Sequence, residues 1–194
     1  MSGADDEAAA VVIGASVGAI GALSAILPQL PADYPLPVIV VVHLPPDRRT
    51  MLPELFAGRC VLPVKEAEDK ERIAPGTIYF APSNYHLLVE PELSFGLSNE
   101  EPVLFSRPSI DVLFESAADA YGSGLTGVIL TGASNDGAHG LKAICKAGGR
   151  ALVQEPASAE SDVMPLAALA ACPAARSLDL KEISTTLRLM VATP

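Results

Sequence analysis

Short apolar runs alternate along this chain with segments of helical periodicity, and this alternation is the strongest constraint on its fold. The run PVIVVVH at residues 37–43 is continuous, as in a strand that is buried on both faces of a sheet. Strands that alternate with helices need crossover connections. The sequence therefore predicts an α/β fold with a doubly wound, mainly parallel sheet and helices on both faces. The other expected strands are AVVIG (10–14), GTIYFAP (76–82), LTGVILTG (125–132) and RALVQEP (150–156).

Helical segments lie between these runs. The clearest is RPSIDVLFESAADAYG at 107–122, which has an apolar face and a glycine stop at Gly122. The segment at 86–99 has strand character around a turn and predicts a small antiparallel excursion. No repeat or linker divides the chain, so we expect one domain at 10–194 after a flexible leader at 1–9. Further helices are expected at 21–30, 50–60, 137–149, 164–172 and 181–192.

Composition excludes several classes of protein. No apolar run among the 194 residues approaches the roughly 20 that a membrane span needs. The net charge is −10, and the one dense basic cluster, Arg48–Arg49, is too small for a nucleic-acid groove. The acidic start does not resemble a signal peptide, so a cytoplasmic protein is expected. Three cysteines far apart, without a CxxC pair, are expected to be reduced and mostly buried: Cys60, Cys145 and Cys172.

Polar side chains capable of catalysis follow several of the expected strands. Ser16 follows the first strand, His43 ends the second, and Asp136 follows the run at 125–132. Sites in such folds lie outside the carboxyl ends of the strands. We therefore expect these three side chains to meet at one edge of the sheet as nucleophile, base and orienting acid. Other polar residues expected at this edge are Ser83, Asn84, His86, Ser134, Asn135 and Glu155.

The turn after the first strand has the pattern of a nucleophile turn. Residues 14–18, GASVG, match G-x-S-x-G between a strand and a helix, where the backbone pushes the serine hydroxyl outward. The chain order Ser16, His43, Asp136 differs from the serine–acid–histidine order of α/β-hydrolases, so that fold is not expected. A dinucleotide site would instead need an acid closing the second strand, where this chain has His43. The glycine spacing after the first strand, Gly14, Gly18 and Gly21, is not G-x-G-x-x-G, and the sequence has no GK[ST] for a P-loop.

Each candidate also has a structural explanation. Ser16 fits as a small polar residue in a glycine turn, and His43 as a histidine satisfied by the backbone at a strand end. Asp136 fits as the cap of the helix that follows it. His86 is the fallback base, and His139, inside a helix, is expected to be solvated or loosely packed.

Several long motifs, in order, resemble the catalytic domain of the bacterial chemotaxis protein-glutamate methylesterase from about residue 10 to about residue 190. They are IGASVG around Ser16, VHLPP at His43, VKEAEDKERIAPGTIYFAP (64–82), RPSIDVLFESAA (107–118), GVILTGASNDGAHGL (127–141) and VQEPASAE…MP (153–165).

The resemblance implies a Ser16–His43–Asp136 triad, because the family's serine stands in I-G-A-S, its histidine opens H-x-P-P and its aspartate stands in L-T-G-x-x-x-D-G. It also implies a doubly wound α/β fold and hydrolysis of γ-glutamyl methyl esters on the cytoplasmic helices of chemoreceptors. Members can also deamidate receptor glutamines, and neither reaction needs a cofactor or a metal. The expected partners are a methylated chemoreceptor and, as an open option, a separate receiver or kinase protein. Well-known members carry a receiver domain ahead of this one, so a stand-alone member or a fragment is expected.

Two local departures from the family pattern surround the expected oxyanion site. The family usually has Thr-Gly-Gly after the serine, where this chain has Val17, Gly18 and Ala19. It commonly has Met-Gly after L-T-G, where Ala133 and Ser134 stand here. The backbone N–H groups of Val17 and Ala133 are the expected oxyanion donors; a lost side-chain donor would lower the rate about 100-fold if it held the oxyanion. The alternatives are a weak or inactive docking module of the same fold and an esterase for small-molecule esters.

Overall fold

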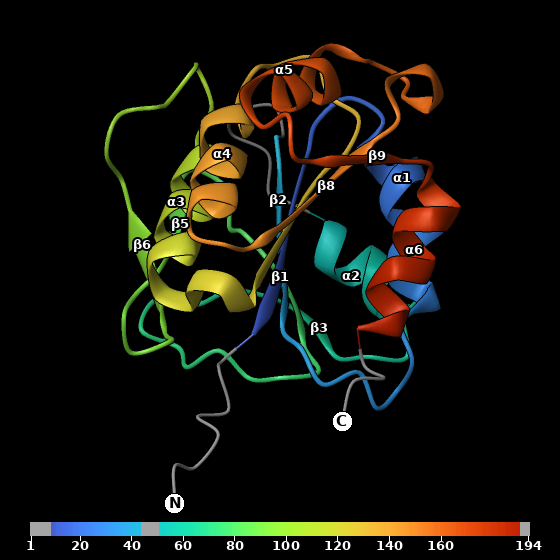
Figure 1. Ribbon diagram of the computed structural model, residues 1–194. Helices are drawn as coiled ribbons and strands as arrows, with labels where there is room; N and C mark the ends of the chain where they lie inside the picture. The colour runs from blue at the N-terminus through green and yellow to red at the C-terminus, as the bar shows by residue number, and fades with distance from the viewer. Residues whose placement is uncertain (1–8, 44–50, 191–194) are drawn as a thin grey trace, which may run out of the picture.

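The computed structural model describes residues 9–43 and 51–190. Most of the expected leader and the basic pair Arg48–Arg49 lie outside these ranges. A seven-stranded parallel sheet, in the order β3-β4-β2-β1-β7-β8-β9, forms the middle of the molecule (Figure 1). Its strands are β1 (Ala10–Ala15), β2 (Val38–Val42), β3 (Val64–Glu66), β4 (Ile78–Phe80), β7 (Leu125–Ile129), β8 (Arg150–Gln154) and β9 (Arg176–Leu178).

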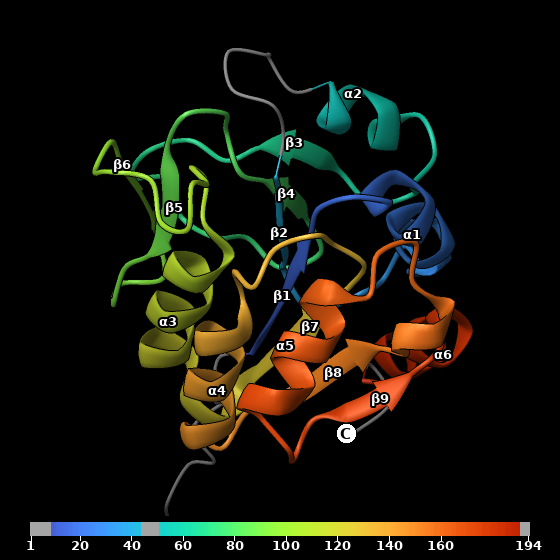
Figure 2. The same ribbon diagram turned by 90° about the horizontal axis from the view of Figure 1, so that it is seen from above.

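Three helices cover each face of this sheet. Helices α1 (Ala19–Ile26), α2 (Leu52–Ala57) and α6 (Leu180–Leu189) share one apolar core with it. Helices α3 (Ile110–Tyr121), α4 (Ala138–Lys146) and α5 (Val163–Ala171) share the other. Figures 1 and 2 show the two layers from the side and from above. The doubly wound α/β fold expected from the sequence is confirmed, and no described helix has the length and apolar character to span a membrane.

The apolar run of β2 shows why the sequence pattern identified the sheet. Ile39 and Val41 point into the core beneath α3, whereas Val38, Val40 and Val42 point into the core beneath α1. All five side chains are buried. Both faces of a parallel sheet are covered by helices, so a central strand has no polar side and its sequence is continuously apolar.

The antiparallel excursion is present, but it is not an edge of the main sheet. Strands β5 (His86–Val89) and β6 (Phe95–Ser98) form a separate two-stranded sheet beside α3. The Val89 N–H donates to Ser116 Oγ of α3 at 3.1 Å, which ties the hairpin to this helix. Strands β3 and β9 were not expected, because each is a three-residue edge strand with polar residues such as Lys65 and Arg176. Three short 3₁₀ turns complete the secondary structure of the described residues: Leu27–Gln29, Gly122–Gly124 and Pro156–Ser158.

The expectation that all three cysteines are reduced is wrong. Cys145 and Cys172 form a disulfide, and Cys60 is free. Cys145 lies in the last turn of α4 and Cys172 directly follows α5. These two helices pack against each other, so residues 27 positions apart in the chain are neighbours in space. Spacing along the sequence carries no sign of that packing.

The winding of the sheet places β1 at the point where the strand order reverses. After β1 the chain builds β2, and then β3 and β4, on one side, and it later builds β7, β8 and β9 on the other. The first neighbours of β1 are therefore β2 and β7, which come from different halves of the chain. Loops that leave two such strands in opposite directions open a crevice at the carboxyl edge, where ligands bind in this class of fold.

Candidate active site

Ser16 stands in a tight turn between β1 and α1. Its N–H donates to Thr131 O at 3.0 Å, and its own carbonyl accepts the Ala19 N–H that opens the helix. Gly18 completes the turn with a φ of 82°, in the left-handed region that favours glycine. The Thr131 hydroxyl donates to Val17 O at 2.9 Å. Thr131, in the segment that follows β7, thus holds the turn through both its carbonyl and its hydroxyl.

Two glycines of the G-x-S-x-G pattern permit close contacts at this turn. A Cβ on Gly14 would lie 2.5 Å from a side-chain carbon of Ile110, at the start of α3. A Cβ on Gly18 would lie 2.8 Å from the Cβ of Glu160. Glycine at both positions lets α3 and the Glu160 segment approach the serine turn closely, so the motif describes packing as well as turn geometry.

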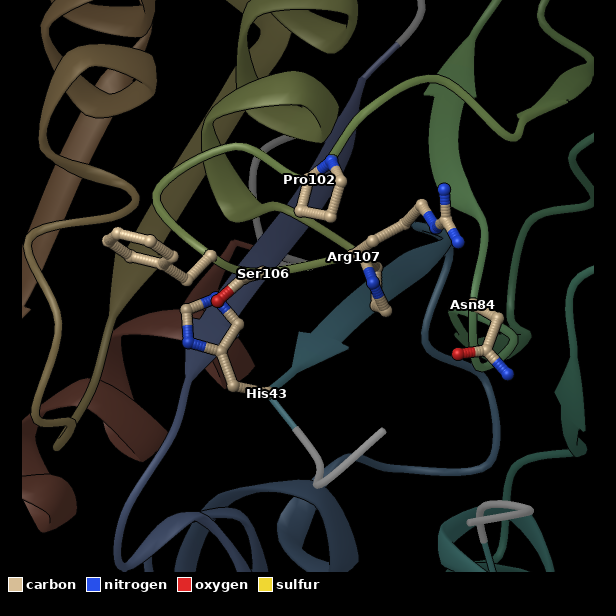
Figure 3. A pocket seen from close by; sticks show the side chains of 7 residues that line it. His43, Asn84, Pro102, Ser106 and Arg107 are labelled. Atoms are coloured by element: carbon tan, nitrogen blue, oxygen red, sulfur yellow. The ribbon is translucent and has the colours of Figure 1, made fainter. Parts of the chain in front are cut away.

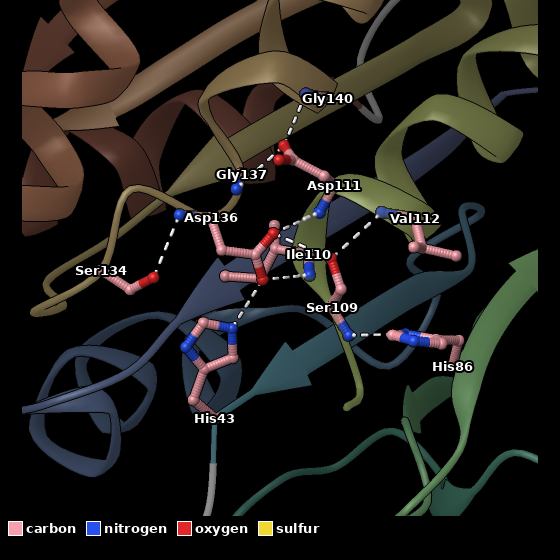
Figure 4. Close-up of polar contacts among 10 residues, drawn as sticks. All are labelled: His43, His86, Ser109, Ile110, Asp111, Val112, Ser134, Asp136, Gly137 and Gly140. Atoms are coloured by element: carbon pink, nitrogen blue, oxygen red, sulfur yellow. Dashed lines mark hydrogen bonds and ion pairs between the residues drawn. The ribbon is translucent and has the colours of Figure 1, made fainter. Parts of the chain in front are cut away.

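His43 follows β2 and lies next to the serine turn. Its N–H donates to Ala15 O at 3.1 Å, which continues the β1–β2 pairing past the end of β2. Its side chain and that of Ser16 line one hollow of about 270 Å³. Ser16 and His43 share this hollow with no direct hydrogen bond between them in the described residues. The other side of the His43 ring meets Asp136, with Nε2 2.7 Å from Oδ2 (Figure 4).

Asp136 is fully buried and its carboxylate accepts four hydrogen bonds. Besides His43, the donors are the Ile110 N–H at 2.7 Å, the Asp111 N–H at 3.0 Å and the Ser109 hydroxyl at 2.8 Å. Burial alone would favour the neutral acid, but the hydrogen bonds from His43 and the backbone outweigh it and lower the pKa of Asp136 below its usual value.

This ionised state decides the tautomer of His43. An ionised carboxylate only accepts hydrogen bonds, so Nε2 of His43 must carry the hydrogen that Asp136 accepts. Nδ1 is then the unprotonated ring nitrogen, and Figure 4 shows it turned away from Asp136. The contact with Asp136 therefore fixes the orientation of the His43 ring and leaves Nδ1 as the nitrogen that can accept a proton.

The helix that Asp136 caps is α3 rather than α4. Its carboxylate accepts the N–H groups of Ile110 and Asp111 in the first turn of α3, whereas the N-cap residue of α4 is Gly137, which has no side chain to form a cap. Asp111 returns the interaction, because its Oδ1 accepts the N–H groups of Gly137 at 2.9 Å and Gly140 at 2.7 Å (Figure 4). Each of these two helix starts is thus capped by a carboxylate that comes from the start of the other. The expectation that Asp136 caps the following helix is wrong, and the positive end of the α3 dipole favours its negative charge.

His86 does not serve as a free base. It is buried, its Nδ1 accepts the Ser109 N–H at 3.1 Å, and its Nε2 lies 3.0 Å from Glu101 O. A carbonyl only accepts, so Nε2 carries the hydrogen and both ring nitrogens are engaged. His86 thus holds Ser109, whose hydroxyl holds Asp136. His139 is exposed on α4, as expected.

The remaining predicted residues occupy the surroundings of His43. Asn84 lines a second, smaller hollow of about 130 Å³ on His43, together with Ser106 and Arg107 (Figure 3). The Ser134 hydroxyl accepts the Asp136 N–H at 3.1 Å. Glu155 is exposed beyond β8, and Asn135 is exposed beside Ser134.

Val17 and Ala133, the predicted oxyanion donors, are both exposed. No acceptor within residues 9–43 and 51–190 takes either backbone N–H group, so both stay predictions for that role. Glu160 also lines the hollow that Ser16 and His43 share, and no pattern in the sequence marked it as a site residue. In the same described ranges, no group of three or more His, Cys, Asp and Glu side chains is arranged to hold a metal ion.

Comparison with known proteins gives consistent relationships. The family model described as CheB methylesterase matches residues 11–187. A Leptospira interrogans protein, provisionally named a protein-glutamate methylesterase/protein-glutamine glutaminase, is 46% identical over 175 residues, which are 90% of this chain and 91% of that protein. An Archaeoglobus fulgidus protein of the same name is 40% identical over 162 residues, 82% of this chain and 46% of its own length. The chain thus spans nearly all of one relative and about half of the other.

A solved structure gives the same assignment. The crystal structure of the Thermotoga maritima CheB methylesterase catalytic domain superposes with a TM-score of 0.90 at 32% identity. The superposition covers 95% of this chain and 99% of that domain. With a family model over most of the chain, a serine turn and a buried aspartate–histidine pair at the edge of a doubly wound sheet, this protein belongs to the CheB methylesterase family.

Proposed function

We propose that this protein hydrolyses glutamate methyl esters on the cytoplasmic helices of chemoreceptors, as a step of adaptation in chemotaxis. Membership of the CheB methylesterase family supports the reaction. One observation carries the assignment of residues: the 2.7 Å contact between His43 Nε2 and Asp136 Oδ2, beside the hollow that His43 shares with Ser16. Residues 10–194 act as the catalytic domain, preceded by a leader at 1–9, and the protein works in the cytoplasm.

The first half of the reaction acylates Ser16. His43 Nδ1 takes the hydroxyl proton as Ser16 Oγ attacks the ester carbonyl, which forms a tetrahedral oxyanion. The ester must bring Ser16 and His43 together as it fills the hollow, because catalytic hydrogen bonds are often long before substrate binds. Collapse of the intermediate breaks the bond to the methoxy group, and His43 gives its proton to the departing methanol. The glutamyl group is then an ester of Ser16.

The second half restores the enzyme. Water gives a proton to His43 Nδ1 and attacks the acyl-enzyme, and the proton returns to Ser16 Oγ as glutamate is released. Asp136 stays ionised throughout and stabilises the charged imidazole. The N–H groups of Val17 and Ala133 hold the oxyanion in both halves, where a well-placed donor contributes about 100-fold or more in rate. A glutamine amide in place of the ester would release ammonia by the same steps, which accounts for a glutaminase activity.

Methanol release from a methylated chemoreceptor tests the proposal, with wild type beside Ser16→Ala. We expect release from wild type and none from the variant, with a melting temperature almost unchanged, because Ser16 makes its structural contacts through backbone groups. Turnover that persists in Ser16→Ala would refute the assignment of the nucleophile.

The same measurement separates the two alternatives. No release from folded wild type would favour a docking module with a disabled site. Hydrolysis of small esters that a receptor helix fails to suppress by competition would favour an esterase for small molecules. A separate receiver or kinase protein that regulates the enzyme would change the rate of methanol release when it is added.

A further inference from the structure

The segment before α3 contains a tight turn with an unusual sequence. Val103 and Ser106 exchange both backbone hydrogen bonds, at 3.0 and 2.8 Å, so Leu104 and Phe105 form a two-residue loop. Both loop residues have positive φ, 47° for Leu104 and 65° for Phe105. Turns of this kind usually carry Asn-Gly, because bulky side chains are strained in the left-handed region. The sequence Leu-Phe therefore disfavours the conformation of this turn.

The same two side chains are also poorly placed for folding. Phe105 is fully exposed and Leu104 is 51% exposed, so neither contributes much to the core. An exposed aromatic on a strained backbone stabilises nothing in the isolated chain. Strained residues that persist in a fold concentrate at sites of binding and catalysis, and exposed apolar groups mark contact surfaces when they gather.

The turn lies at the catalytic histidine. Phe105 and Ser106 line the hollow of about 130 Å³ that His43 also lines, and Figure 3 shows Ser106 beside the His43 ring. His43 belongs to both hollows, with Ser16 in one and the turn in the other. The Leu104–Phe105 turn therefore stands across His43 from the nucleophile.

The turn is also anchored to the site. Arg107 Nη1 donates to the carbonyls of Asn99 and Glu100, both at 3.0 Å, which closes the base of the segment. Two residues further on, the Ser109 hydroxyl donates to Asp136. A partner that contacts Phe105 is thus held at a fixed position relative to the His43–Asp136 pair.

On the opposite side, the Ser16 hollow has an apolar rim of its own. Ile20 lines that hollow and is exposed, and Val17 beside it is exposed as well. Neither hollow, at about 270 and about 130 Å³, is large enough for more than a side chain. A helix is about 10–12 Å across, so a helical substrate would insert one side chain and rest its remaining surface on these rims.

We propose that Leu104 and Phe105 are specificity residues that bind the apolar face of the helical protein segment whose ester reaches Ser16. The inference rests on the proposed function, because it takes the ester to be carried by a protein helix. Aromatic anchors beside a groove are the usual way in which an amphipathic helix is held, and such anchors carry a large share of the binding energy. A small ester does not extend to the turn and does not depend on it.

The test replaces Leu104–Phe105 by Asn-Gly, the sequence that suits this turn. The variant L104N/F105G should fold at least as stably as wild type, because the substitution relieves strain. Leu189→Ala is the matched control: Leu189 is 63% exposed at the end of α6, on a helix that does not line either hollow. Each protein is assayed on a methylated chemoreceptor fragment and on p-nitrophenyl acetate. Binding of the fragment is measured separately in a Ser16→Ala background.

We expect kcat/KM on the receptor to fall about tenfold or more in L104N/F105G, through KM and weaker binding. Hydrolysis of p-nitrophenyl acetate by L104N/F105G should fall less than its activity on the receptor, and every value for Leu189→Ala should stay within about twofold of wild type, the scale of a substitution outside a hot spot. Unchanged receptor binding in L104N/F105G, an equal loss on both substrates, or a wild type that does not bind the fragment would overturn the inference. Wild type that binds the fragment in a turn-dependent way but releases no methanol would support the docking role and refute the proposed function instead.

Discussion

Removal of the Asp111 carboxylate should weaken the start of α4 and its link to α3. Its Oδ1 accepts the N–H groups of Gly137 and Gly140, and the residue is only 6% exposed. A hydrogen bond to a charged group contributes about 1.5–3 kcal/mol, and a buried donor left without a partner costs about 1–3 kcal/mol. Asp111→Ala removes two such bonds, so we expect the free energy of unfolding to fall by about 3–5 kcal/mol.

Asp111→Asn separates the hydrogen bonds from the charge. Both bonds reach the same oxygen, and the carbonyl oxygen of Asn can accept both. Burial raises the pKa of Asp111 and the charge of Asp136 adds to this effect, although the bonds from Gly140 and Gly137 oppose it. A neutral side chain therefore suits the position, and we expect Asp111→Asn to change the free energy of unfolding by less than about 1 kcal/mol.

The effect on catalysis should follow the effect on geometry. Gly137 directly follows Asp136, so loss of its anchor moves the group that orients His43. A displacement of about 1 Å at a catalytic group lowers the rate about 100-fold, and we expect a loss of that order in kcat for Asp111→Ala but not for Asp111→Asn.

Urea unfolding and hydrolysis of p-nitrophenyl acetate measure the two effects. Asp119→Ala is the control, because it removes an exposed carboxylate from the same helix. The capping role of Asp111 is refuted if Asp111→Ala lowers the free energy of unfolding and kcat no more than Asp119→Ala does. It is also refuted if Asp111→Asn lowers both as much as Asp111→Ala does.

Two further measurements test the remaining groups. The lowered pKa of Asp136 stabilises the fold above the ordinary carboxyl pKa, and this contribution is lost in acid. Wild type should therefore lose more free energy of unfolding than Asp136→Asn between about pH 6 and about pH 3, and parallel unfolding curves would contradict this. Reduction of the Cys145–Cys172 disulfide, which spans 27 positions, should lower the free energy of unfolding by about 3–4 kcal/mol, as urea unfolding with and without reductant would measure. Cys60→Ser should respond to reductant as wild type does, and a double Cys145→Ser/Cys172→Ser variant should not respond.

The sequence predicted the fold because its main signals are local. The apolar run of β2 and the periodicity of α3 depend on neighbours within a few residues, and both elements lie where they were expected. Ser16, His43 and Asp136 could be predicted to gather because parallel strands end at a common edge, although their catalytic roles stay a prediction.

The contacts that hold the site could not be predicted in the same way. Ser109 reaches Asp136 across 27 positions, and His86 reaches Ser109 across 23. These pairings depend on the angle at which α3 meets the sheet, which no local pattern specifies. The Cys145–Cys172 disulfide depends in the same way on how α4 packs against α5.

The fold therefore depends on the side chain of Asp136 but not on that of Ser16. Ser16 contributes backbone hydrogen bonds to the turn, and its hydroxyl makes no hydrogen bond within residues 9–43 and 51–190. Asp136 instead accepts two N–H groups of α3 and the Ser109 hydroxyl in addition to His43. Any loss of its carboxylate leaves several buried donors unpaired, each at a cost of about 1–3 kcal/mol. Natural changes that silence the enzyme should for this reason be tolerated at Ser16 far more readily than at Asp136.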